Sequence, residues 1–193
     1  HPRKPKLSGG LMTPGARVAA QIDILEAILS GVPAEKAMTN WARGNRFAGS
    51  KDRAALRDLV FQALRCRRSA GALPVPQSAR AWAIGALLAN GADPHEFFTG
   101  IAHAPAALSA DDVTPLPSDR DRLDLQGWVI DLLTQQYGSE QTAEIGAVLR
   151  HRAPITLRVN LQKTTRAQLK AELAKAEIET TLNPASDTAL TVL

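Results

Sequence analysis

Eight cations gather within residues 41–68 of this 193-residue chain, where only two acidic residues, Asp52 and Asp58, accompany them. Guanidinium and ammonium groups bind phosphate oxygens, so the chemistry that this stretch offers is recognition of a polyanion. Gly44 and Gly49 would also let backbone amides approach a phosphate closely. An ordinary amphipathic helix with a solvated cationic side would give the same pattern. The eight cations are Arg43, Arg46, Lys51, Arg53, Arg57, Arg65, Arg67 and Arg68.

The second half of this stretch predicts a helix that would position most of these cations. Ser50 suits its N-cap, and Asp52 in the first turn suits the positive end of the helix dipole. Apolar residues recur from Leu56 to Leu64 at helical spacing, so one face can anchor in a core while the next presents cations. We therefore predict phosphate contacts from Arg43, Arg46, Lys51, Arg53 and Arg57.

Arg17 is the sixth predicted contact in this half of the chain, in the first turn of an earlier helix that Pro14-Gly15 opens. A cation there opposes the helix dipole, and a bound phosphate would offset that cost. An exposed surface arginine is the alternative interpretation.

Residues able to perform covalent or metal chemistry form no recognisable site. The four histidines lack metal-ligand spacing with Cys or acidic partners, and no phosphate loop or hydrolase motif is present. Cys66 is interpreted as an inert thiol, although its neighbouring arginines could lower its pKa. We therefore predict no catalytic, cofactor-binding or metal-binding residue in this chain.

Charge and composition narrow the class of binding partner and the cellular compartment that we expect. Residues 1–68 carry 13 Lys and Arg against 5 Asp and Glu, whereas residues 69–193 carry 10 against 14. This asymmetry indicates a polyanion-binding front half, without separating RNA, DNA and anionic lipid. A single cysteine fits a reducing, cytoplasmic compartment. We expect no membrane segment, because no apolar run reaches the ~18 residues that a span needs.

Hydrophobic periodicity predicts a mainly α protein followed by the start of a small α/β part. Helices are expected from Pro14 to Gly31, after Pro33, over 78–90 and from Asp93-Pro94 through Ile101. The predicted organisation is a disordered basic arm over 1–14, a helical domain over 15–104, a linker over 105–118, and helices plus an incomplete α/β subdomain over 119–193. Two of those later helices are expected over 123–137 and 140–150.

After Pro154, the spacing of the apolar residues changes from helical to strand-like. Residues 155–160, 178–182 and 189–193 alternate as strands do, and Thr165 with Gln168 predicts a capping box for a helix between the first two. Because side chains alternate along a strand, Arg158 and Asn160 would lie on the same face. That face is a candidate RNA or interdomain contact, and simple polarity at a strand edge is the alternative interpretation. Because a unit this small cannot close a sheet and core alone, we expect that the natural chain continues.

Two stretches resemble a known family. Residues 15–68, with Arg17 and AlaGlySerLysAspArgAlaAlaLeuArgAspLeuValPheGlnAlaLeuArg, resemble the NusB fold and the NusB-like domain of the Fmu/Sun (RsmB-type) ribosomal RNA cytosine-5 methyltransferases. Residues 153–170, AlaProIleThrLeuArgValAsnLeuGlnLysThrThrArgAlaGlnLeuLys, are similar to that family's segment entering its catalytic half.

The resemblance implies a NusB-like RNA-binding bundle followed by an RRM-like subdomain. The parent enzyme would use S-adenosylmethionine to methylate C5 of a cytosine in small-subunit, 16S-type ribosomal RNA. This chain lacks the family's glycine-rich cofactor loop and both cysteine motifs, so we expect it to bind and position RNA without methylating it. The alternatives are a NusB-like protein-interaction or antitermination module that docks a ribosomal or other protein, and a helical DNA-binding protein.

Overall fold

The computed structural model describes residues 11–71, 78–112 and 116–193. The basic arm predicted over 1–14 lies mostly outside the described residues. The chain forms two compact units, His1–His151 and Arg152–Leu193, and each unit is described by itself. In the parts that the structure describes, no helix combines the length and the apolar character needed to cross a membrane.

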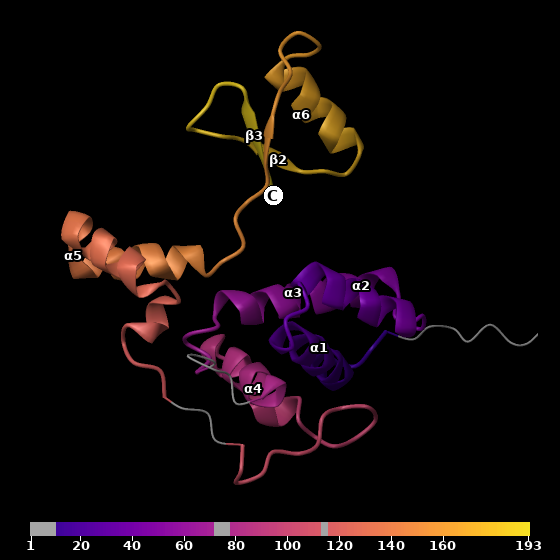
Figure 1. Ribbon diagram of the computed structural model, residues 1–193. Helices are drawn as coiled ribbons and strands as arrows, with labels where there is room; N and C mark the ends of the chain where they lie inside the picture. Colours follow the sequence, from indigo (N-terminus) through magenta and orange to yellow (C-terminus); the bar gives the residue numbers. More distant parts are fainter. Residues whose placement is uncertain (1–10, 72–77, 113–115) are drawn as a thin grey trace, which may run out of the picture. The chain divides into compact units, whose positions relative to one another are not determined.

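Four helices build the core of the first unit, and α1 packs against the other three (Figure 1). Thr13 caps α1 by accepting a hydrogen bond from the Ala16 amide, and Ser78 caps α4 in the same way. Ser50, the predicted N-cap of α3, is instead its first helical residue, because Gly49 takes the cap position. The bounds are α1 Pro14–Leu29, α2 Ala34–Gly44, α3 Ser50–Arg65 and α4 Ala79–Ala89.

Two apolar clusters hold these helices together. The larger joins α1, α4 and the end of α3 around the fully buried Trp82, whose Nε1 donates to the Ala63 carbonyl oxygen at 3.1 Å. The smaller joins α1, α2 and α3 around Ile24 and Val60. Gly85 permits close approach of α4 to the segment after α3, because a Cβ there would lie 2.0 Å from the Ala70 carbonyl oxygen. The middle of α4 is therefore held closely against the segment that follows α3.

The prediction of a helix from Asp93-Pro94 through Ile101 is wrong beyond the first turn. Only a 3-10 turn, η1 (Pro94–Glu96), forms there, with the Asp93 side chain accepting from the His95 amide. The turn ends at its C-cap, Phe97, and Gly100, with a φ of 69°, keeps the chain out of helical geometry before Ile101. Residues 101–104 form a turn that closes with the Ala104 amide donating to the Ile101 carbonyl.

Residues 105–112, part of the predicted linker, lie against the helical unit. Arg80 donates to Asp112 at 2.7 and 2.8 Å and to the carbonyls of Ala106 and Ala107, and it lies 4.7 Å from the Phe98 ring centre. Hydrogen bonds from Arg80 and the Ser109 amide hold the pKa of Asp112 well below its ordinary value, against the opposing effect of burial. The boundary between the two units accordingly falls after His151, later than the predicted linker.

The last part of the first unit contains the 3-10 turn η2 (Asp121–Leu123) and helix α5 (Gly127–Leu149). The sequence predicts two helices here, with Gly138 stopping the first. Gly138 does interrupt α5, with φ 82° and ψ 168°, so two helical segments meet at that residue.

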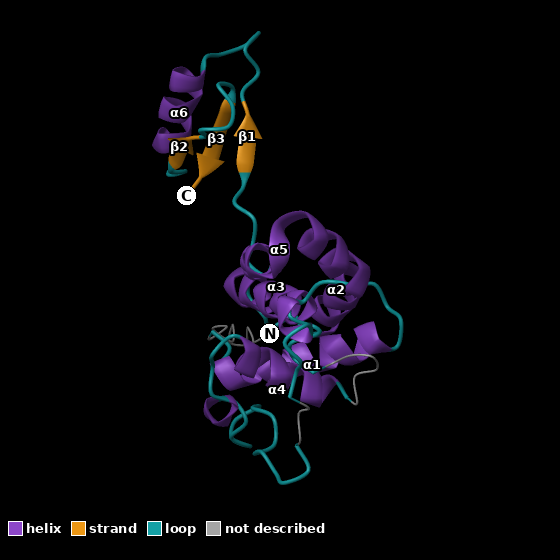
Figure 2. Ribbon diagram, turned by 90° about the vertical axis from the view of Figure 1, so that its left-hand side faces the viewer, coloured by secondary structure: helices purple, strands orange, loops and turns teal. Residues whose placement is uncertain are grey.

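The second unit is a three-stranded antiparallel sheet with one helix. The strand order is β1-β3-β2, and α6 packs on β2 and β3 (Figure 2). The predicted capping box of Thr165 and Gln168 is present at the start of α6. Val159, Ala189 and Leu190 supply the buried apolar positions. The elements are β1 Thr156–Arg158, α6 Arg166–Lys175, β2 Thr180–Leu182 and β3 Ala189–Val192.

Candidate nucleic-acid interface

The eight predicted RNA contacts fall into two sets, one in each unit. Arg158 and Asn160 belong to the second unit. The remaining six stand on the first unit and come from α1, α2, α3 and the connection between α2 and α3. They are Arg17, Arg43, Arg46, Lys51, Arg53 and Arg57.

Arg17 is occupied by an internal partner. Its Nε and Nη2 donate to Asp52 Oδ1 at 3.3 and 2.9 Å, and the Met12 amide donates to the same oxygen at 3.0 Å. Burial opposes the charge of Asp52, which is 3% exposed, but these hydrogen bonds outweigh it and lower the pKa of that carboxyl. Arg17 therefore ties the start of α1 to the start of α3. The sequence indicated only that the charge of Asp52 suits the dipole of its own helix. It did not reveal the ion pair with Arg17, which lies 35 positions away in the chain.

Four cations at the α2–α3 corner are open to solvent. We call Arg43, Arg46, Lys51 and Arg53 the open cations: all are exposed, and none has a carboxylate within ion-pair distance among the described residues. Lys51 and Arg53 lie in the first turn of α3, where positive charge opposes the helix dipole. The only acidic residue in that turn is Asp52, whose charge Arg17 already satisfies. This corner therefore holds uncompensated positive charge.

Arg57 differs from the open cations, although one helical turn separates it from Arg53. Its Nη2 pairs with the Glu35 carboxylate on α2, and its guanidinium carbon lies 5.7 Å from the Phe61 ring centre. Both partners of the ion pair are more than half exposed, so the pair is weak and open to exchange with another anion.

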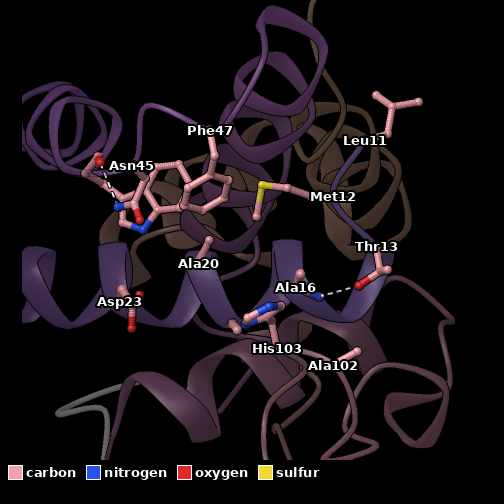
Figure 3. A pocket seen from close by; sticks show the side chains of 12 residues that line it. Leu11, Met12, Thr13, Ala16, Ala20, Asp23, Asn45, Phe47, Ala102 and His103 are labelled. Atoms are coloured by element: carbon pink, nitrogen blue, oxygen red, sulfur yellow. Dashed lines mark hydrogen bonds between the residues drawn. The ribbon is translucent and has the colours of Figure 1, made fainter. Parts of the chain in front are cut away.

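A largely apolar pocket of about 630 Å³ is formed by α1, α2, the connection between α2 and α3, and the turn after η1 (Figure 3). Trp41 and Phe47 meet edge to face in its wall, with ring centres 6.3 Å apart, and Phe47 is 63% exposed. Arg46 stands between Asn45 and Phe47, which both line the pocket. No sequence pattern signalled this pocket. Its lining consists of Leu11, Met12, Thr13, Ala16, Ala19, Ala20, Asp23, Trp41, Asn45, Phe47, Ala102 and His103.

The turn after η1 supplies one side of this pocket in a strained conformation. Ala102 and His103 both adopt positive φ, 46° and 71°, which residues with a side chain rarely do. Gly15 lets this turn approach α1, because a Cβ there would lie 2.7 Å from the Ala104 Cβ. Burial and the nearby Glu26 raise the pKa of Asp23 at the rim, against a hydrogen bond from Trp41.

A second cavity, of about 460 Å³, lies where α3 ends and α5 begins. We call Arg65, Arg67 and Arg68 the cavity arginines. The sequence placed them in the basic stretch without naming them as contacts, and only the Arg-Cys-Arg-Arg run signalled them. The cavity is lined by Leu64, Arg65, Arg67, Arg68, Asp124, Gln126, Gly127 and Trp128.

Cys66 lies in the middle of the cavity arginines but turns into the core. It is 3% exposed, and burial together with the charge of Asp124 raises its pKa to about 11. The neighbouring arginines therefore do not activate this thiol, in agreement with its interpretation as inert.

Arg158 and Asn160 do not share a strand face in the second unit. Arg158 ends β1, opposite Ala189 of β3, and its side chain is exposed. Asn160 lies beyond the strand, where its Oδ1 accepts from the Gln162 amide and its carbonyl accepts from Lys163 and Thr164. Asparagine favours such local turns, which shortens the predicted strand.

Comparison with known proteins finds a family match for the C-terminal region and a solved structure with a similar fold. Residues 126–193 match the ferredoxin-like domain of RsmF/B-like methyltransferases, which confirms the resemblance of this region to the RsmB-type family. The crystal structure of PH0851 shares the fold, with a TM-score of 0.53 and 14% identity over 94% of this chain. The alignment covers 49% of PH0851, so this chain spans about half of that protein's length. None of the curated proteins compared with the chain matches it.

Proposed function

We propose that this chain, whose residues 126–193 match the ferredoxin-like domain of RsmF/B-like methyltransferases, binds ribosomal RNA through its helical unit. It would position that RNA for a methyltransferase that uses S-adenosylmethionine to modify C5 of a cytosine. The observation that carries the proposal is the group of open cations, which no carboxylate among the described residues compensates.

Electrostatics gives these cations a specific role. Lys51 and Arg53 sit at the positive end of α3, where a phosphate would relieve their repulsion with the helix dipole. Arg43 and Arg46 extend the charge from the end of α2 into the connection before α3. Contacts of this kind fix the position of a nucleic acid on the protein without reading its sequence. The charge of this corner therefore supports a positioning role.

S-adenosylmethionine has no matching site among the residues present. The family's glycine-rich loop and cysteine motifs do not occur in this sequence, and Cys66 is buried with a raised pKa. No step of methyl transfer is therefore assigned to this chain. Its residues would hold the RNA, and the transfer chemistry would belong to other residues of the enzyme.

Reversal of Arg53 and Arg57 to Glu tests the proposal. R53E/R57E should weaken binding of a ribosomal RNA fragment at least about tenfold and lower the salt slope of log K by about 1.4, from about 0.7 per lost contact. Filter binding or fluorescence anisotropy measures both quantities, and circular dichroism should show unchanged helix content. K170E/K175E on α6 makes the same charge change at exposed positions and should have a smaller effect. Unchanged binding of R53E/R57E at low salt would remove this site assignment.

Protein docking is the second candidate function, and the apolar pocket of Figure 3 favours it. Trp41, Phe47 and Met12 offer a contact surface for an apolar side chain, and Asp23 at the rim would face a cation of the same peptide. A partner that survives nuclease treatment of a lysate and is lost with F47E would support this function. A partner lost on nuclease treatment alone would favour RNA.

A further inference from the structure

The cavity arginines create a concentrated positive field inside a recess. Among the described residues, three guanidinium groups line the cavity with one carboxylate, Asp124. A second carboxylate, Asp121, pairs with Arg68 at 3.7 Å between Oδ1 and Nη1. That carboxylate is 2% exposed and already accepts from the Arg68 amide, the Ser69 amide and Ser69 Oγ at 2.9, 2.8 and 2.6 Å. Its charge is further balanced by Arg150, whose Nη1 lies 3.7 Å away. Asp124 therefore supports the wall of the cavity, and Arg65 and Arg67 keep no carboxylate partner among the described residues.

Arg67 carries an unsatisfied donor. Its Nε is buried and has no hydrogen-bond partner among the described residues, while its guanidinium lies 5.1 Å from the Trp82 ring centre. Buried N–H groups are nearly always paired, so Arg67, which lines the cavity, carries an unmet capacity for hydrogen bonding. Arg65, by contrast, donates its Nε to the Arg150 carbonyl at 3.0 Å, which fixes its side chain at the cavity wall.

The start of α5 adds to the same field. Gln126 at the N-cap makes no side-chain cap, and no acidic residue occupies the first turn. Gly127 and Trp128 line the cavity at this uncapped, positive end of the helix. Together with the guanidinium groups of the cavity arginines, the first backbone amides of α5 offer hydrogen bonds to the oxygens of an anion in a region of positive charge.

Trp128 indicates which anion fits. Its side chain is 63% exposed at the cavity rim, and its Nε1 donates to Gln126 Oε1 at 2.6 Å, which restrains the ring. An exposed, restrained indole beside a phosphate site suits an unpaired base that stacks on it. We propose that the cavity binds one phosphate of single-stranded RNA through Arg65, Arg67 and Arg68, with the adjoining base stacked on Trp128. This inference rests on the proposed RNA-binding function and adds a second anchor to the open cations.

The test uses the full chain with a labelled single-stranded RNA of about ten nucleotides and an abasic ribose-phosphate oligomer of equal length. R67Q should weaken both ligands about tenfold and lower the salt slope by about 0.7. W128A should weaken only the RNA, about tenfold, and W128F should retain most of the affinity. R122Q, which changes an exposed arginine outside this cavity, should bind both ligands as the unmodified chain does.

The outcomes separate this site from the broader function. Normal binding of both ligands by R67Q and W128A, with binding lost in R53E/R57E, overturns the cavity site and leaves the proposed function standing. Absence of any salt-sensitive RNA complex with the unmodified chain overturns both. Inorganic phosphate that occupies the cavity while W128A binds RNA normally assigns the site to free phosphate and contradicts the proposal. If R67Q loses its helical circular dichroism, R67K and the exposed W128A carry the test.

Discussion

The open cations and the cavity arginines come from the two ends of one basic stretch, yet the fold treats them differently. Arg43, Arg46, Lys51 and Arg53 are exposed to solvent at the α2–α3 corner. Arg65, Arg67 and Arg68 are half-buried between the end of α3 and the start of α5. The difference teaches that charge density in a sequence does not decide exposure. The packing of the next elements decides whether a cation is a mobile surface group or a fixed donor in a recess.

Replacement of Gly85 by Ala should have the largest effect on this comparison, because Gly85 lets α4 approach the segment that follows the cavity arginines. The new Cβ would lie 2.0 Å from the Ala70 carbonyl oxygen, which is backbone and cannot move aside cheaply. We expect G85A to lower the free energy of unfolding by about 3 kcal/mol, measured by chemical denaturation.

G44A is the matched control at the other end of the comparison. Gly44 is helical, and a Cβ there meets nothing within 4 Å, so Ala should be neutral or slightly stabilising. Equal stability of G85A and the unmodified chain would show that α4 approaches the segment after α3 less closely than described.

The pH dependence of Cys66 sharpens the same comparison. Its folded-state pKa of about 11 lies above the ordinary value of 9.0, so the unfolded chain loses this proton first as pH rises. The stabilisation that the buried, protonated thiol gives to the folded state is complete below pH 9, and it is lost as the pH rises from 9 to about 11. Between about pH 7 and about pH 10.5, the unmodified chain should lose about 2 kcal/mol more unfolding free energy than C66A.

Denaturation of both proteins at the two pH values measures this difference, since other titrating groups are common to both. An equal loss in C66A would mean that the thiol ionises as readily in the folded state. The cavity arginines would then act on Cys66 as the sequence alone allowed.

Sequence periodicity predicted the helices well, because each depends on local signals. Pro14 opens α1, Ser78 caps α4, and Thr165 with Gln168 forms the capping box of α6. The missed feature after Pro94 depended on backbone geometry, since the left-handed Ala102 and His103 have no local signature comparable to glycine. Local patterns therefore located elements and failed where tertiary packing imposed an unfavoured conformation.

The candidate site was predicted less completely than the fold. Exposure of the open cations follows from their spacing, whereas the Arg17–Asp52 pair joins positions far apart in the chain. To predict the cavity, one would have had to place Trp128 beside the cavity arginines. Trp128 lies 60 residues beyond Arg68, and no motif links it to the basic stretch. Long-range contacts of this kind are set by packing, and the local patterns of a single sequence do not reveal them.

The salt dependence of RNA binding tests the central claim most directly. If cations of the helical unit engage about five phosphates, log K for a ribosomal RNA fragment should fall with log salt at a slope of about −3.5 to −4.5. The measurement needs only the unmodified chain and anisotropy titrations at several salt concentrations. A slope near zero, or no complex at low salt, would contradict the account.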